Sequence, residues 1–164
     1  MAGFVEPILW GMTMKTAAAA LMLSLALAAP AAAQSYVYSG TMDDGSQVGF
    51  VDRDSLQRAG TTVTAWNLWV YNPAQELAPG IVLSYALRQN TYDCSRRSTV
   101  QRFVILYSES GEPIHSGAPD DTGSVPWIPG SMGEAIGNLV CGPTPPAGSG
   151  VSLSRALARA RTPR

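Results

Sequence analysis

Few side chains in this sequence could do chemistry, and the titratable ones lie in predicted turns and loops. His115 is the single histidine, so a catalytic triad or a histidine metal site would have to use it. It follows Pro113 in a turn, and nothing around it indicates a base held by a carboxylate. Asp121-Thr-Gly123 matches the aspartic-protease triplet, but that chemistry needs two such carboxylates sharing one proton. A lone triplet in a proline-bounded loop is typical of an ordinary turn.

The signals for metal and phosphate chemistry are equally weak. The pairs Asp43-Asp44 and Asp52/Asp54 could hold a cation weakly, but no EF-hand spacing follows them and their neighbours are typical of turns. The sequence has no phosphate-binding glycine loop, no C-x-x-C motif and no nucleophile elbow. We therefore predict no catalytic, cofactor-binding or metal-binding residue, and a protein that is not an enzyme.

The N-terminal segment has the pattern of a secretory signal peptide. Lys15 precedes an apolar run that ends in the small residues Ala29-Pro-Ala-Ala-Ala33. A membrane-spanning helix is disfavoured because spanning needs about 20 apolar residues. We expect residues 1–33 to be the signal peptide, with cleavage after Ala33 and no transmembrane span in the exported chain. Residues 1–11 contain no basic residue, which indicates a misassigned start codon.

Cys94 and Cys141 are the two cysteines of the chain. In an oxidising compartment such a pair usually forms a disulfide, and two free buried thiols are the less favoured alternative. Closing a loop of this length would stabilise the fold by about 4 kcal/mol through the lost entropy of the unfolded chain. Because Cys141 ends a predicted helix and Cys94 lies among predicted strands, we expect the pair to tie the helix to a sheet.

Runs of β-branched and aromatic residues predict that sheet. About six segments separated by short turns have strand composition: residues 36–38, 47–51, 61–71, 81–94, 100–107 and 114–115. A loop is predicted between Asn72-Pro73 and Pro79-Gly80. Consecutive strands with short turns imply an antiparallel meander, and a helix that follows the strands places the chain in the α+β class.

The strongest predicted strand, residues 61–71, has two apolar faces. Alternation places Trp66, Leu68 and Val70 on one face, and Val63, Ala65, Trp69 and Tyr71 on the other. One face must pack against the helix. The other face is either covered by a second layer or exposed as an apolar surface that can bind a partner. Trp69 and Tyr71 are candidate partner-binding residues if their face is open, and core residues otherwise.

One helix is predicted to end the domain, from Ser131 to Cys141. Ser131 and Glu134 form an S-x-x-E capping box. Apolar residues at i, i+4, i+7 and i+8 predict its buried face: Met132, Ile136, Leu139 and Val140. Cys141 falls beside that stripe, so we expect it to have left helical geometry. The predicted fold is an antiparallel sheet of about six strands with one C-terminal helix packed on it and tethered by a disulfide.

The end of the chain differs from the body in charge and composition. Residues 34–142 contain six arginines against eleven acidic residues, a net charge of −5, which argues against nucleic acid as a partner. Residues 143–164 begin as a Pro/Gly-rich linker and carry four arginines. We expect this segment to be disordered, because the apolar side of any helix there is mostly alanine. The alternative is a short basic helix whose Arg155 and Arg159 contact an anionic lipid surface or a partner.

Several short motifs, taken in order, give the chain a resemblance to a known family. They are Phe50-Val-Asp52 with Ser55-Leu56, Val63 to Trp66, Tyr92-Asp-Cys94, Trp127 to Ser131 with Glu134, and Val140-Cys141. With the two cysteines they make residues 34–142 similar to the surface-adhesin protein E family of Gram-negative envelope proteins. The resemblance implies a sheet with a C-terminal helix fastened by a Cys94–Cys141 bond. It also implies an adhesin for host extracellular-matrix and plasma proteins, although this chain lacks the lipobox cysteine of the lipid-anchored member.

We expect an exported, non-enzymatic envelope domain, in the periplasm or on the outer cell surface of a Gram-negative bacterium. In the first hypothesis it is adhesin-like and holds a protein partner, of the extracellular-matrix type, on its sheet face or loops. The alternative is a structural or accessory subunit of a periplasmic assembly with no host-adhesion role, in which the arginine tail makes the contact. Neither hypothesis involves nucleic acid or a cofactor.

Overall fold

The computed structural model describes residues 34–143 and 146–162, so the predicted signal peptide and its cleavage site lie outside the described residues. Within them the chain forms eight strands, one short 3-10 helix (η1) and two α-helices. Their bounds are β1 Tyr36–Thr41, β2 Gln47–Asp52, η1 Arg53–Ser55, β3 Gln57–Ala59, β4 Thr62–Ala78, β5 Ile81–Asp93, β6 Ser98–Tyr107, β7 Pro113–Gly117, β8 Val125–Pro126, α1 Met132–Cys141 and α2 Leu153–Arg161.

The strands form one antiparallel sheet. Its continuous path runs β1-β2-β4-β5-β6-β7, while β3 pairs with β4 and β8 pairs with β6. Short turns join neighbouring strands; in the β1–β2 turn Gly45 adopts a φ of 72° and donates its N–H to the Met42 carbonyl at 2.8 Å. The predicted antiparallel sheet and the α+β class are confirmed, and six strands lie on the continuous path.

Strand β4 is longer than the sequence predicts. It continues through Asn72-Pro73, where a loop was expected, and ends at Ala78. The register between β4 and β5 jumps from Val70 opposite Tyr85 to Gln75 opposite Leu83. Pro73 therefore lies in an irregular stretch where no ladder N–H is required of it, which is how a strand accommodates proline.

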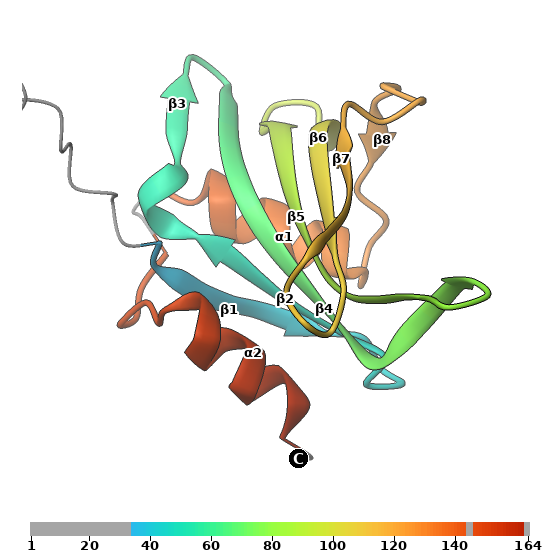
Figure 1. The fold of residues 1–164 in the computed structure, drawn as a ribbon. Helices are drawn as coiled ribbons and strands as arrows, with labels where there is room; N and C mark the ends of the chain where they lie inside the picture. The colour runs from blue at the N-terminus through green and yellow to red at the C-terminus, as the bar shows by residue number, and fades with distance from the viewer. Residues whose placement is uncertain (1–33, 144–145, 163–164) are drawn as a thin grey trace, which may run out of the picture. The chain divides into compact units, whose positions relative to one another are not determined.

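The sheet carries one helix on each face, as Figure 1 shows, with α1 behind the sheet and α2 in front of it. The α1 face contains the buried cluster Val51, Val63, Ala65, Tyr92, Trp127, Met132, Ile136 and Val140. The α2 face contains the buried cluster Tyr36, Val48, Phe50, Leu68, Val70, Tyr85, Leu87, Ala156 and Ala160. Both apolar faces of β4 are therefore used, one against each helix.

Helix α2 corrects two expectations, a single helix and a disordered tail. Ala156 and Ala160 are buried against the aromatic cluster of the α2 face. Tyr36 and Val151 exchange two backbone hydrogen bonds of 2.9 Å just before the helix begins, and Arg161 donates to Ser84 Oγ at 2.7 Å. Alanine contributes little area itself, but its small side chain lets the helix backbone approach the large side chains of the sheet closely.

Helix α1 begins at a well-formed cap. The Ser131 hydroxyl accepts the Glu134 N–H at 3.2 Å, and the Glu134 carboxylate accepts the Gly130 N–H at 2.8 Å. Glu134 also pairs with Arg97, from the β5–β6 turn. These contacts satisfy backbone donors that the first turn would otherwise leave unpaired, and they confirm Ser131 as the N-cap.

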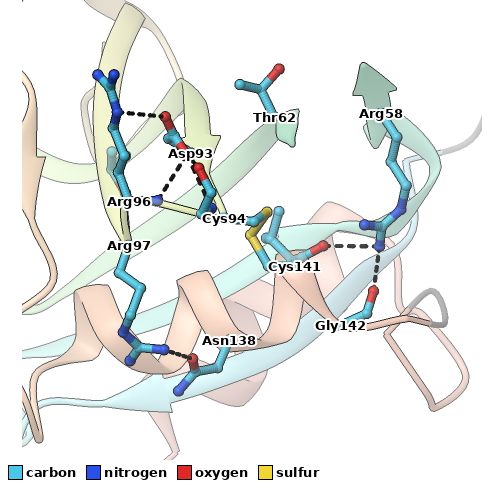
Figure 2. The surroundings of a disulfide bond; sticks show 12 residues. Arg58, Thr62, Asp93, Cys94, Arg96, Arg97, Asn138, Cys141 and Gly142 are labelled. Atoms are coloured by element: carbon cyan, nitrogen blue, oxygen red, sulfur yellow. Dashed lines mark hydrogen bonds and ion pairs between the residues drawn. A yellow bond between two sulfur atoms is a disulfide. The ribbon is translucent and has the colours of Figure 1, made fainter. Parts of the chain in front are cut away.

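The other end of α1 is held covalently. Figure 2 shows the Cys94–Cys141 disulfide, which joins the helix to the turn after β5 with the two Cα atoms 5.6 Å apart. Arg58 donates to the Val140 carbonyl at 3.0 Å and to the Gly142 carbonyl at 2.7 Å, satisfying two acceptors at the helix end. The predicted tether is confirmed, but Cys141 remains helical. A side chain beside the apolar stripe is well placed for Cys94, which lies beyond the end of β5.

Candidate functional site

A pocket of about 270 Å³ opens on the α1 face, between the start of α1, the strands β5 and β6, and the β8 segment. We call it the Trp69 pocket. It is lined by Trp69, Arg88, Asn90, Tyr92, Thr99, Gln101, Val125, Pro126, Trp127, Ile128, Ser131, Gly133 and Ile136. Aromatic and aliphatic side chains predominate, with a few polar groups among them, as is usual for ligand and partner sites.

Short strand β8 positions one wall of the pocket. It pairs with the start of β6, Thr99 opposite Val125, and the Trp127 N–H then donates to the Arg97 carbonyl at 2.8 Å. The Trp127 indole N–H donates to Thr99 Oγ1 at 2.7 Å. Its ring lies against Gly137 of α1, where a Cβ atom would overlap it. A glycine in the middle of α1 therefore lets helix and tryptophan come together beside the pocket.

Arg88 is the charged residue of the pocket. Its guanidinium carbon lies 5.0 Å from the centre of the Trp69 ring, a cation–π contact. Its Nη2 donates to the Tyr71 hydroxyl at 2.8 Å. Within the described residues, the buried Nε–H of Arg88 and the buried indole N–H of Trp69 have no hydrogen-bond acceptor. Buried donors without acceptors are uncommon in folded proteins, because each carries a desolvation cost.

Tyr92 at the pocket is neutral at physiological pH. Burial raises the pKa of Tyr92 to about 12, and Asn90 donates its side-chain amide to the hydroxyl at 3.3 Å. No aspartate or glutamate is among the lining residues. The pocket thus combines apolar walls with a single positive charge, which suits binding of an anionic or acceptor group.

The structure places the sequence-predicted residues in three different settings. Trp69 is half-buried and lines the pocket. Tyr71 is buried, 6% exposed, and its hydroxyl accepts a hydrogen bond from Arg88. Arg155 and Arg159 are exposed on α2, which packs on the opposite face of the sheet. The structure therefore does not combine the four residues into one site.

Arg88 is a functional candidate that sequence reasoning missed. It is the one charged residue between Ile81 and Tyr92, and the next charged residue is Asp93 at the end of the strand. It alternates in step with Asn90 and Tyr92, which also line the pocket. A charge within a strand whose neighbours are buried was the available signal, because such a charge usually needs a partner.

The residues first considered for catalysis lie away from the Trp69 pocket. His115 is exposed on the short strand β7. The Asp121 carboxylate accepts the N–H of Gly123 at 2.7 Å, a local turn contact. Over residues 34–143 and 146–162, no group of three or more His, Cys, Asp or Glu side chains is placed to hold a metal ion. In the same part of the chain, neither helix has the length and apolar character needed to cross a membrane.

Comparison with known proteins identifies a family for most of the described chain. Residues 35–142 match the family described as Surface-adhesin protein E, which leaves α2 outside the match. No curated protein matches the chain. Among solved structures, crystal form II of Haemophilus influenzae protein E is 12% identical with a TM-score of 0.45, covering 57% of this chain and 79% of that one. The selenomethionine form of the same Haemophilus influenzae protein is 12% identical with a TM-score of 0.46, covering 65% and 85%. The match over residues 35–142 spans well over half of the sequence, and the chain belongs to the surface-adhesin protein E family.

Proposed function

We propose that this protein is a non-enzymatic, adhesin-like binding domain of the cell envelope that holds a protein partner at the Trp69 pocket. Membership of a surface-adhesin family implies an exported, envelope-associated protein and supports an adhesive role. The observation that carries the proposal is the pocket itself, where aromatic walls surround one arginine. Tryptophan, tyrosine and arginine are the residues that most often dominate binding at protein interfaces.

The rim of the pocket supports a partner of considerable size. Val125 and Ile128 line the pocket and are 62% and 66% exposed. Exposed aliphatic side chains beside a partly buried aromatic centre provide apolar area that a partner can cover. We assign Trp69 to the centre of the contact and these two residues to its edge, whereas Tyr71 supports Arg88 from behind.

Site-specific photo-cross-linking tests this proposal. A benzophenone amino acid replaces Ile128 in the exported protein, which is then exposed to an immobilised basement-membrane extract and, separately, to the envelope of its own organism. We expect one predominant covalent adduct after irradiation, identified by mass spectrometry. The matched control carries the same photo-reactive group at Ser154, which is exposed on α2.

Two outcomes would contradict the proposal. One is the absence of any adduct from position 128 under both conditions. The other is an equal set of adducts from positions 128 and 154, which would indicate non-specific contact. As a further check, Ile128→Asp should abolish capture of the adduct partner, because it introduces a charge into apolar contact area.

A second candidate function rests on the ordered position of α2. The helix exposes Arg155 and Arg159 while Ala156 and Ala160 are buried on the sheet. This arrangement would let a structural or accessory subunit present a basic surface to an acidic component of a periplasmic assembly. The double variant Arg155→Gln/Arg159→Gln separates the two functions. It should release the protein from such an assembly and leave the adduct from position 128 unchanged.

A further inference from the structure

The charge of the Trp69 pocket is unbalanced. Arg88 is half-buried there, and the lining residues include no carboxylate. Within residues 34–143 and 146–162 the ion pairs are formed by Arg53, Arg96 and Arg97, and none involves Arg88. A partly desolvated cation is screened less by salt than an exposed one. The pocket therefore attracts an anion.

Among the residues that line the pocket, the buried polar groups without a partner are donors. The Nε–H of Arg88 and the indole N–H of Trp69 have no acceptor within the described chain, and the two side chains are stacked on one another. A carboxylate is an acceptor with two oxygens, and it forms its strongest hydrogen bonds with guanidinium groups. Phosphate or sulfate carries more oxygens than these donors serve, and it has no apolar part to cover the pocket walls.

The walls determine what the carboxylate is attached to. Trp69, Tyr92 and Trp127 present rings to the pocket, and Val125 and Ile136 add aliphatic surface. Its volume of about 270 Å³ is at the small end of ligand pockets, which run from roughly 300 to 1,000 Å³. The ligand body is therefore apolar, compact and suited to stacking on aromatic rings.

From this combination we propose that the Trp69 pocket binds a small aromatic carboxylic acid. The carboxylate pairs with Arg88 and the ring lies among the aromatic walls. This binding goes beyond the proposed protein partner, because the pocket would hold a free acid whether or not a partner covers its rim. A small acid fits the pocket because its volume is small and its charge is a single cation.

The test is a titration of the purified exported protein with phenylacetate, followed by ¹H–¹⁵N NMR at the Trp69 indole N–H. We expect that signal to shift at millimolar or lower phenylacetate. Phenylacetamide, which has the same ring and no charge, should bind at least about tenfold more weakly, because hydrogen bonds to charged groups are the stronger ones. Acetate, which lacks the ring, should bind at least about tenfold more weakly as well.

Two protein variants test the role of Arg88. Arg88→Gln should weaken phenylacetate binding at least about tenfold. Arg102→Gln, which removes the same charge from an exposed site that does not line the pocket, should leave binding unchanged. If Arg88→Gln does not fold, the affinities of the unaltered protein for phenylacetate and phenylacetamide are sufficient to test whether the pocket requires a carboxylate.

Three results would overturn the inference. The first is equal affinity for phenylacetate and phenylacetamide. The second is no shift of the Trp69 signal at about 10 mM phenylacetate. The third is binding of the tripeptide Gly-Gly-Phe, with a free C-terminus, when phenylacetate itself does not bind. The last result would assign the pocket to a peptide C-terminus instead. The photo-cross-link from position 128 is a separate readout, so failure of the small-acid proposal can be distinguished from failure of the protein-partner proposal.

Discussion

The two helices of this protein are attached to opposite faces of one sheet by different means. Helix α1 has a covalent bond at its end, Cys94–Cys141, and an ion pair from Glu134 to Arg97 near its start. Helix α2 lies outside the family match and is seated by buried alanines, the backbone bridge at Val151 and one hydrogen bond from Arg161. Both helices complete a hydrophobic cluster, so the difference lies in how each is held.

That difference in attachment accompanies a difference in packing. Helix α1 meets the sheet through large side chains such as Met132 and Ile136, and the Trp69 pocket opens along its flank. Helix α2 meets the sheet through the buried Ala156 and Ala160, with Leu153 and Leu157 packed beside them. The hollow near its end is bordered by Asp44 of the β1–β2 turn and Asn72 of β4. A hollow therefore lies beside each helix, and what differs is that α1 is held by a covalent bond at its end whereas α2 is held by packing and hydrogen bonds.

The largest expected effect comes from removing the covalent bond on the α1 face. Cys94→Ser opens a loop whose ends are 47 residues apart, which should lower the free energy of unfolding by about 4 kcal/mol. Urea denaturation measures the loss. Cys141→Ser should cost the same, and the double variant should cost no more than either single one, because all three remove one bond. A loss below about 1 kcal/mol would show that packing alone holds α1.

The matching perturbation on the other face places a charge under α2. Ala156 is fully buried, so Ala156→Asp should cost about 2–3 kcal/mol, an amount limited by detachment of the helix. Limited trypsin digestion should then cut at Arg155 and Arg159 while the body stays intact. Ala158→Asp is the control, since Ala158 is exposed on the same helix. Equal digestion of the two variants would mean that α2 is not seated as the structure shows.

Two glycines of α1 offer a smaller, sharper comparison. A Cβ at Gly137 would overlap the Trp127 ring, whereas at Gly133 its nearest neighbour would be Ser131 Oγ at 3.5 Å. Gly137→Ala should destabilise by about 1–2 kcal/mol, since overpacking outweighs the gain in helix propensity. Gly133→Ala should stabilise by up to about 1 kcal/mol. Thermal unfolding of both variants provides the measurement, and the same sign for both would contradict the close approach of Trp127.

The smallest expected effect concerns pH at the turn that carries Cys94. The Ser95 hydroxyl, followed by the backbone N–H groups of Ser95 and Arg96, lowers the pKa of Asp93 from its ordinary 3.8. A lowered folded-state pKa contributes stability above the unfolded value, and that stability is lost as pH falls through the folded value. Asp93→Asn should therefore flatten the decline of stability below about pH 4. Asp120→Asn, at an exposed loop position, is the control, and an equal change in both variants would exclude a specific role for Asp93.

Much of the fold could be predicted because its signals are local. The cap at Ser131, the turn at Gly45 and the strand composition of residues 61–71 depend on near neighbours in the chain. The course of β4 through Pro73 could not be predicted, because it depends on a register jump against β5. The packing of α2 could not be predicted either. An alanine-rich face gives a weak apolar signal in the sequence, and its burial depends on a surface that distant residues form in the folded protein.

The candidate site divides in the same way. Trp69 was predicted as a binding candidate from its place on an apolar strand face, while Arg88 and Trp127 were not. Arg88 reaches Trp69 through the pairing of β4 with β5, and Trp127 reaches the same pocket through the pairing of β8 with β6. Those contacts join residues far apart in the chain, so no local sequence pattern predicts them.

By itself, the sequence determined the class of the protein: an antiparallel sheet, a capped helix and a cysteine pair that ties them together. These features follow from alternation, capping chemistry and cysteine count, which are properties of short segments and of composition. Only the folded arrangement shows that α2 covers the second face, and that Arg88 lies in an aromatic pocket without an ion pair to any described residue. Burial and electrostatic isolation depend on what surrounds a side chain in space, and the order of residues along the chain does not specify those surroundings.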